Sequence, residues 1–323
     1  MRSAVFMWPG PPVLRDGTRP SHWWAFEDHF SVRRKVDKIF EWLGASSPSQ
    51  SLSRLCLHLI NLRGLMAVVG GADLPDDERP RIIAAYAPEV DAAQHRTGLS
   101  SDATSRALAS VDQLARLIHD EIAKRRLEDS VDVLFVSDHG MAETSNDRLV
   151  FLDDLLGTED FAAVSSQEGW PSAGLRFKPG TDEGRVYRKL LEASQQPHSG
   201  FDVFTHDTMP ERWHFTANSR IAPLYVVPRV GWSITNRDEF HVKFNGDYHP
   251  KANHGWDNDD PSMRAFFVAS GPFARNVNRV LKGKPLPAFA NLEIYELVAS
   301  LLFIPPERRA PNNGTVGFWD QYL

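Results

Sequence analysis

Carboxylate and imidazole side chains, which are common ligands of zinc-like ions, gather in four short segments of this chain. The segments are residues 91–95, 137–140, 253–255 and 257–258. Two such ions held about 3.5–4 Å apart can stabilise both the attacking and the leaving oxygen of a displacement at phosphorus. That chemistry also needs a nucleophile, and none is evident in these segments. The five ligand candidates are Asp91, His95, Asp138, His139 and His254.

Each motif also has a plain structural interpretation when it is taken alone. Asp138 and His139 precede a glycine, and a turn with a capping aspartate would have the same sequence. Asp91 and His95 lie four residues apart, which places both on one face if they begin a helical turn. They would equally suit a capping aspartate and a solvated histidine. His254 alone would fit a polar surface loop, so the motifs indicate a metal site only in combination.

The apolar pattern predicts the elements that position these motifs. Residues 30–43 show three- and four-residue spacing and predict an amphipathic helix, whereas residues 4–8 and 81–87 suit short strands. Residues 103–126 predict a long helix, followed by a clear strand over 131–136. We expect one face of the long helix to be apolar through Leu108, Val111, Leu114, Ala115, Ile118 and Ile122.

This order of strand, helix and strand predicts an α/β fold, with a central, mostly parallel sheet and helices on both faces. Residues 263–271 contain a further buried strand in this interpretation, and residues 290–302 a helix. The first two motifs follow the carboxyl ends of strands, where open α/β sheets place their ligands. Residues 158–250 are mixed and rich in proline and aromatic residues, so we interpret them as a subdomain or a long excursion.

The bulk composition excludes several classes of protein. The chain has 323 residues, of which 42% are hydrophobic and 24% charged, with a net charge of −6. No nucleic-acid-binding surface is evident, because such surfaces need clustered lysine and arginine. No segment approaches the roughly 20 apolar residues of a membrane span, and no signal-peptide pattern occurs. A single cysteine, Cys56, permits no internal disulfide.

Several ordered motifs together resemble one known family. They are FMWPG at residues 6–10, ERP at 78–80, YAPEVD at 86–91, VSDHGM at 136–141, NHGWDN at 253–258 and PNNGT at 311–315. The sequence resembles the nucleotide pyrophosphatase/phosphodiesterase family, also called type I phosphodiesterases, of the alkaline phosphatase superfamily. Two positions depart from the usual family pattern, with Val90 in place of a proline and Gln94 in place of a glycine.

The resemblance implies an alkaline phosphatase-like fold and metal-dependent hydrolysis of phosphodiester or pyrophosphate bonds in nucleotides. It implies two divalent metal ions, expected to be zinc. Asp91, His95 and His254 would hold one ion, and Asp138 and His139 would supply half of an incomplete second site. The expected partner is a small phosphodiester or nucleotide, and the choice between nucleotide and lipid stays open.

Tyr86 and Trp23 are weak candidates for substrate binding, because loop aromatics more often serve packing. Family members are often secreted or membrane-anchored. The sequence itself carries neither signal nor anchor and assigns no location.

In the family, the threonine nucleophile and its neighbouring aspartate lie upstream of the segment that matches residues 6–10. We therefore expect residues 1–323 to be the C-terminal two-thirds of one phosphodiesterase domain, with the N-terminal part missing and activity impaired. Residues 44–72 interrupt the family pattern without a clean period, so we expect an insertion, either a surface loop or a translated intron.

Two alternatives remain open at this point. One is a non-catalytic truncated homologue or a metal- or nucleotide-binding fragment. The other is a relative of the phosphoglycerate mutases or sulfatases, which lack the motifs at residues 253–258 and 311–315.

Overall fold

A computed structural model describes most of the chain. The described residues are 2–8, 13, 16–27, 30–43, 79–216 and 218–323, together with the backbone of residues 55–60. The chain forms two compact units. The first contains residues 1–92, 105–138 and 265–323, and the second contains residues 93–104 and 139–264.

The first unit is built on a six-stranded sheet with the order β15-β6-β3-β5-β1-β2. All pairings in it are parallel except that of β15 with β6. The strands are β1 (Ser3–Phe6), β2 (His22–Trp24), β3 (Leu55–Ile60), β5 (Ile82–Ala85), β6 (Val131–Val136) and β15 (Phe267–Ser270). The predicted mostly parallel sheet is thus confirmed, with one antiparallel strand at its edge.

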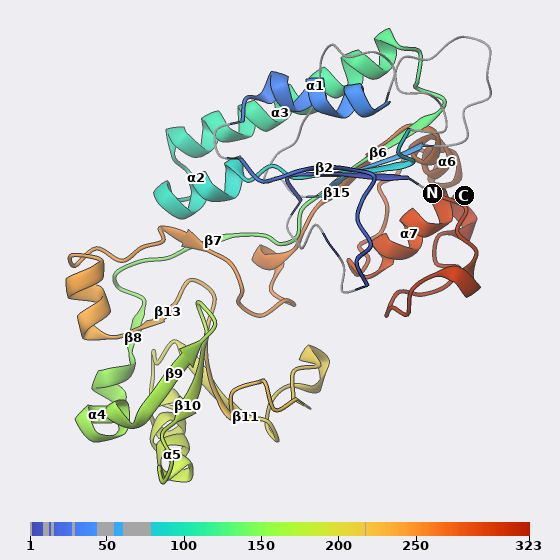
Figure 1. Ribbon diagram of the computed structural model, residues 1–323. Helices are drawn as coiled ribbons and strands as arrows, with labels where there is room; N and C mark the ends of the chain where they lie inside the picture. Colours follow the sequence, from blue (N-terminus) through green and yellow to red (C-terminus); the bar gives the residue numbers. More distant parts are fainter. Residues whose placement is uncertain are drawn as a thin grey trace. The chain divides into compact units, whose positions relative to one another are not determined.

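Helices cover both faces of this sheet, as predicted. Helices α1 (Val32–Leu43) and α3 (Asp102–Lys124) lie on one face, and α6 (Pro272–Leu281) and α7 (Glu293–Leu301) pack on the other (Figure 1). A separate hydrophobic core lies on each face of the sheet. Side chains along β6 point to alternate faces, so Val133 joins the first core, under α1 and α3, and Leu134 joins the second, under α6 and α7.

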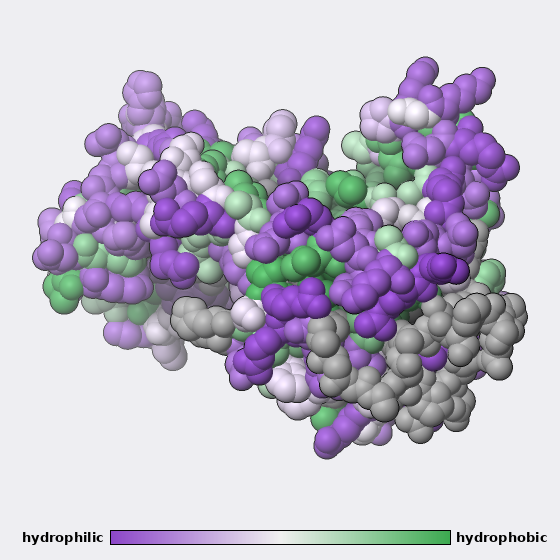
Figure 2. Space-filling model, turned by 90° about the horizontal axis from the view of Figure 1, so that it is seen from above, coloured by the Kyte–Doolittle hydropathy of each residue, from purple (hydrophilic) through white to green (hydrophobic). Residues whose placement is uncertain are grey.

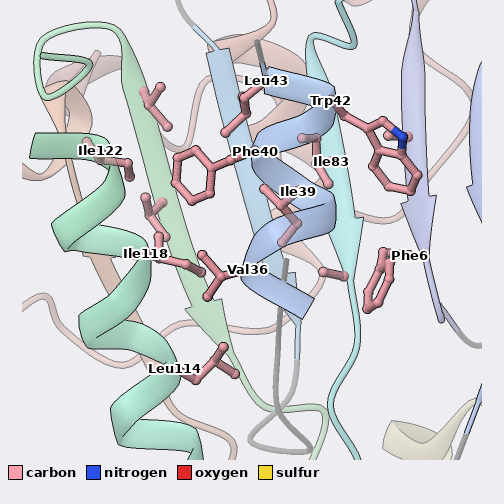
Figure 3. Packing of buried hydrophobic residues seen from close by; sticks show 14 of the residues in the cluster. Phe6, Val36, Ile39, Phe40, Trp42, Leu43, Ile83, Leu114, Ile118 and Ile122 are labelled. Carbon is pink, nitrogen blue, oxygen red and sulfur yellow. The ribbon is translucent and has the colours of Figure 1, made fainter. Parts of the chain in front are cut away.

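The first core is dense and forms between α1, α3 and the sheet (Figure 3). Val36, Ile39 and Phe40 of α1 are at most 1% exposed, and α3 contributes Leu114 and Ile118. Their spacing of three or four residues places them on the inner faces of the two helices.

Two expectations about burial in this unit are wrong. Leu108 was expected on the apolar face of α3, yet it is 43% exposed, because that face begins about one turn later in the helix. The strand expected to be buried near residue 267 is only partly buried. Val268 in β15 is 54% exposed, since an edge strand is covered less completely than a central one.

Most of the predicted insertion, residues 44–72, lies outside the described residues. Within it, β3 pairs in parallel with β5 on one side and with β6 on the other. These six residues are therefore part of the sheet and not a surface loop. Whether residues 44–72 are an insertion relative to the family stays a prediction.

The second unit has its own sheet and core. An antiparallel sheet with the order β11-β12-β10-β9 packs against α4 (Leu152–Ala163) and α5 (Glu183–Ser194). Asp182 caps α5 by accepting a hydrogen bond from Arg185 N, at 2.9 Å. The strands are β9 (Val164–Glu168), β10 (Ala173–Phe177), β11 (Phe201–Thr205) and β12 (Leu224–Pro228).

Two short strand pairs complete the second unit. They are β8 (Leu149–Phe151) with β13 (Ser233–Thr235), and β7 (Ala142–Glu143) with β14 (Ala252–Asn253). The predicted mixed segment, residues 158–250, falls inside this unit.

The surface is polar where it can be seen. Figure 2 shows one face on which hydrophilic side chains dominate and hydrophobic ones occur in smaller patches between them. Among the described residues, no helix has both the length and the apolar character that crossing a bilayer requires.

Candidate metal centre

Helix α2 (Glu89–Thr97) carries two of the ligand candidates one turn apart. Asp91 is 6% exposed, and His95 follows four residues later on the same face. The first turn also holds Glu89, which forms a close ion pair with the ammonium group of Lys35 on α1. Because Lys35 is almost fully buried, this pair ties the start of α2 to the first core.

The end of α2 is held by the segment that precedes His254. His95 donates its Nδ1 hydrogen to the backbone oxygen of Ala252, with 2.8 Å between the two atoms. The backbone oxygen of His95 accepts a hydrogen bond from Lys251 N, also at 2.8 Å. With Nδ1 used as a donor, Nε2 keeps the lone pair that a metal ion needs.

His254 follows β14, which places it next to residues from another part of the chain. β14 pairs antiparallel with β7, with Asn253 opposite Ala142. Asn253 is fully buried, and its Oδ1 accepts a hydrogen bond from His254 N at 2.9 Å. The strand pairing and the hydrogen bond from His254 N therefore both fix the backbone that carries the His254 ring.

The rings of His95 and His139 both lie close to the His254 ring, so three histidine rings lie together. The His254 ring centroid lies 5.1 Å from that of His95 and 3.5 Å from that of His139, on which it stacks with planes 14° apart. Within the described part of the chain, Asp91, His95 and His254 form a group that could hold a metal ion. Each offers one ligand atom, and these atoms lie within 4.8 Å of one another.

Asp138 and His139 directly follow β6, as predicted. His139 donates its Nδ1 hydrogen to the Gly140 oxygen at 2.8 Å, which again leaves Nε2 as the basic nitrogen. Gly140 itself is required for packing: an added Cβ would lie 2.0 Å from the backbone oxygen of Ser262. The glycine thus permits a close approach of the 3₁₀ helix Pro261–Met263, a reason that its turn-like sequence did not reveal.

The segment 257–258 contributes no ligand to the candidate group. Asp257 forms a two-point ion pair with Arg212, whose Nη1 lies 2.8 Å from Oδ1. That hydrogen bond holds the pKa of Asp257 below its ordinary value of 3.8. Asn258 Oδ1 accepts from the same Arg212 nitrogen at 3.1 Å.

The two weak substrate candidates lie in the first unit. Trp23 belongs to the edge strand β2 and is 49% exposed. Tyr86 packs against the first core, and its backbone N donates to Phe6 O at 3.2 Å. Their assignment to substrate binding stays a prediction.

Sequence reasoning missed an aromatic neighbour of the ligand candidates. The Trp170 ring centroid lies 6.1 Å from that of His95, and its indole Nε1 donates to the Tyr248 hydroxyl at 3.0 Å. Trp170 is nevertheless 48% exposed. It lies in the mixed segment 158–250, where no sequence pattern distinguished it from packing aromatics.

Comparison with known proteins gives consistent results. Residues 1–257 match the family model "Type I phosphodiesterase / nucleotide pyrophosphatase". A pyrophosphatase/phosphodiesterase of Schizosaccharomyces pombe is 34% identical over 318 residues, covering 98% of this chain and 57% of that protein. The bis(5'-adenosyl)-triphosphatase of Xenopus laevis is 31% identical over 316 residues, covering 98% of this chain and 58% of that protein. The chain thus spans little more than half the length of these two relatives.

The fold is also that of solved structures. Murine ectonucleotide pyrophosphatase/phosphodiesterase 5, as an inactive variant in complex with AMP, matches with a TM-score of 0.72. Its sequence is 24% identical, and the match covers 98% of this chain and 70% of that one. The human protein 5 matches with a TM-score of 0.70. The alkaline phosphatase-like fold expected from the sequence is thereby confirmed.

Proposed function

The chain belongs to the type I phosphodiesterase/nucleotide pyrophosphatase family, and on that premise we propose that it binds zinc and hydrolyses phosphodiester or pyrophosphate bonds in nucleotides. In this proposal, Asp91, His95 and His254 hold one ion. Asp138 and His139 contribute to a second. The names of two relatives support a nucleotide substrate, since one is a bis(5'-adenosyl)-triphosphatase and the other was solved with AMP.

The observation that carries the proposal is the hydrogen bond from His95 Nδ1 to the Ala252 oxygen. Metal-binding histidines commonly donate their second ring nitrogen to a backbone carbonyl or a carboxylate, which fixes the tautomer and the ring direction. A set of two imidazoles and one carboxylate is also a known ligand set of catalytic zinc. The residues present therefore fit the expected ion.

Bound divalent ions would stabilise negative charge on the phosphoryl oxygens during the displacement. The described residues would do the positioning. Asp91 and His95 are set one turn apart by α2, and Asn253 fixes the backbone of His254. We propose no nucleophile among the residues that the structure describes.

A second candidate function is binding of zinc or a nucleotide without turnover. Within the described residues, a group of three ligand candidates occurs around His254, and it does not include Asp138 or His139. Two protein ligands bind zinc weakly compared with the three that are usual for catalytic zinc. A second ion held by so few ligands would support a binding role better than catalysis.

One experiment separates the two functions. Zinc binding is measured by competition with a chromophoric chelator, and hydrolysis with the 4-nitrophenyl ester of thymidine monophosphate. Turnover of about 1 s⁻¹ or above that is lost in His254→Ala and kept in the exposed control His241→Ala would support hydrolysis. Zinc binding without turnover would support the second candidate. Absence of zinc binding would contradict hydrolysis at a zinc site and leave only nucleotide binding from the second candidate.

A further inference from the structure

The turn between β9 and β10 brings an aromatic side chain to the candidate metal centre. This turn consists of residues 169–172, and Gly169 opens it with a φ of 84°, a left-handed conformation that glycine adopts without strain. Trp170 comes next, and its ring centroid lies 6.1 Å from that of His95, with planes 30° apart. Aromatic rings in contact usually have centroids about 4.5–7 Å apart, so the two side chains pack together.

The indole of Trp170 is held by a buried tyrosine. Its Nε1 donates a hydrogen bond to the Tyr248 hydroxyl at 3.0 Å. Tyr248 is only 2% exposed, and its backbone N donates to Asn146 Oδ1 at 2.9 Å. Burial and this hydrogen bond fix the tyrosine, so the tyrosine in turn fixes the direction of the indole.

The same turn also touches the segment that carries His254. A Cβ at Gly255 would lie 3.2 Å from Pro171 Cδ and 3.4 Å from the Trp170 oxygen. The turn therefore contacts two ligand-bearing segments of the second unit. It reaches His95 through the indole ring, and it reaches the residue after His254 through its backbone and its proline.

The His95 ring needs more than its hydrogen bond to keep one orientation. The Ala252 oxygen holds the ring at a single atom, Nδ1. The torsion that turns a histidine ring about its bond to Cβ is broad and not confined to narrow wells. A metal ligand must nevertheless be held within about 0.5 Å of its working position by the groups around it. The indole packed against the ring supplies such a restraint.

The exposure of Trp170 argues against a role in the hydrophobic core. The side chain is 48% exposed, and within the described part of the chain the core of the second unit does not include it. Hydrophobic stabilisation is roughly proportional to the apolar area removed from water, so a half-exposed indole contributes less than a buried one. The contact with His95 explains a large ring at this position better than core packing does.

We propose that Trp170 is a positioning residue, which holds the imidazole of His95 in the orientation that presents Nε2 to a zinc ion. In this proposal Trp170 touches neither the ion nor a substrate and acts through His95 alone. The part played by zinc rests on the function proposed above. The effect of Trp170 on the His95 ring does not require a metal ion.

Nuclear magnetic resonance of the histidine side-chain nitrogens tests this effect without metal. The whole chain is studied with a chelator in alkaline buffer, where histidines are neutral. The His95 signal is identified by its absence from His95→Gln. We expect the wild type to show the tautomer with hydrogen on Nδ1, and slow exchange of that hydrogen because Ala252 accepts it. Trp170→Ala should lose the slow exchange and show both tautomers, whereas Trp170→Phe keeps a ring beside His95 and should retain both features.

Phe215→Ala is the control for removal of a partly exposed aromatic ring. Phe215 is 38% exposed, lies in the same unit and packs on Tyr225, with ring centroids 5.2 Å apart. Its loss should leave the His95 signal unchanged. Competition with a chromophoric chelator then measures zinc binding. We expect Trp170→Ala to bind zinc about tenfold more weakly, as for loss of other groups that hold a ligand, and Phe215→Ala to bind it like the wild type.

Thermal unfolding confirms that each variant is folded. An unchanged His95 signal in Trp170→Ala, or the same change in Phe215→Ala, would overturn the proposal. Zinc binding that is equally strong in the wild type and in Trp170→Ala would also overturn it. If the wild type does not bind zinc, the proposed function fails, while a His95 signal that changes in Trp170→Ala and is retained in Trp170→Phe still supports the positioning of the ring.

Discussion

The imidazole of His139 stacks on that of His254, with ring centroids 3.5 Å apart and planes inclined by 14°. The two histidines come from segments separated by more than 100 residues. β14 and β7 bring these segments together, because the strands that carry them pair directly. His254 therefore contacts both His95 and His139, the candidates for the two expected metal sites.

Removing His254 should have the largest effect on zinc binding. Loss of an outer-shell partner of a metal ligand costs about 10–100-fold in affinity, and loss of a ligand should cost more. We therefore expect His254→Ala to weaken zinc binding by at least about 100-fold in competition titrations. The exposed residue His241 provides the control, since His241→Ala should leave the affinity unchanged. Equal affinity in both variants would refute the ligand assignment.

Gly140→Ala should destabilise the protein and disturb the candidate metal centre. The new methyl group would lie 2.0 Å from the Ser262 oxygen, so backbone must move. Overpacking of this kind costs about 1–3 kcal/mol. Denaturant unfolding measures the loss, and zinc titration measures the effect on the site.

Gly184→Ala is the matched control for this substitution. Gly184 lies in the first turn of α5, and its nearest neighbours are side-chain atoms at 3.4 Å. Alanine there should be neutral or stabilising by up to about 1 kcal/mol. If Gly140→Ala and Gly184→Ala change the free energy of unfolding equally, the close approach of Ser262 to Gly140 does not require a glycine.

The ion pair of Lys35 and Glu89 should support Asp91 through helix α2. Lys35 is 1% exposed, and burial lowers its pKa from the ordinary value of 10.5. Lys35→Met removes the charge and keeps much of the volume, but leaves Glu89 without this partner. Because Glu89 is partly exposed, we expect a loss of about 1–3 kcal/mol in the free energy of unfolding.

The effect of Lys35→Met on zinc should be smaller than that of losing a ligand. We expect an affinity about tenfold lower, as for other groups that position ligands. Lys35→Arg keeps the positive charge, so it should lose less zinc affinity than Lys35→Met. Stability lost with no change in zinc affinity would show that the pair supports the core alone.

The pair of Arg212 and Asp257 should make a pH-dependent contribution to stability. The hydrogen bond that Arg212 donates to Asp257 lowers the pKa of this carboxyl group in the folded state below 3.8. The stabilisation is therefore present above the unfolded-state pKa and is lost as the pH falls through the folded-state pKa. Asp257→Asn should cost up to about 1 kcal/mol at pH 7, as for partly exposed ion pairs.

This difference between wild type and Asp257→Asn should disappear in acid. Urea unfolding at pH 7 and again below about pH 3 measures it. A deficit that is the same at both pH values would mean that the carboxylate charge is not responsible.

Local patterns predicted the elements well, but not their surroundings. The spacing of Val36, Ile39 and Phe40 gave both the helix and its buried face, since a helix repeats every 3.6 residues. Strand β6 was equally clear, because both its faces are covered. The exposed positions Leu108 and Val268 depend on where neighbouring elements end, which the sequence pattern does not contain.

For the candidate site, too, the sequence predicted which residues take part but not the contacts that position them. Residue types offered five ligand candidates, and the family resemblance implied that Asp91, His95 and His254 share one ion. The structure brings these three together. The sequence could not show that the Ala252 oxygen accepts the hydrogen bond from His95, because every residue has a carbonyl. It also could not show that the carboxylate of Asp257 binds Arg212. Both facts follow from which segments meet in space, and strand pairing between distant segments decides that.

The hydrogen bond between His95 and Ala252 also sets an order of events during folding. It joins residues 157 positions apart, so the ligand group is completed only after a long loop has closed. Contacts of such long range form slowly, since the chain loses the entropy of closing the loop before it gains the contact. During synthesis from the N-terminus, Asp91 and His95 would emerge well before His254. If the group binds zinc as proposed, the ion would bind late. It would then stabilise a chain that has already folded and would not start its folding.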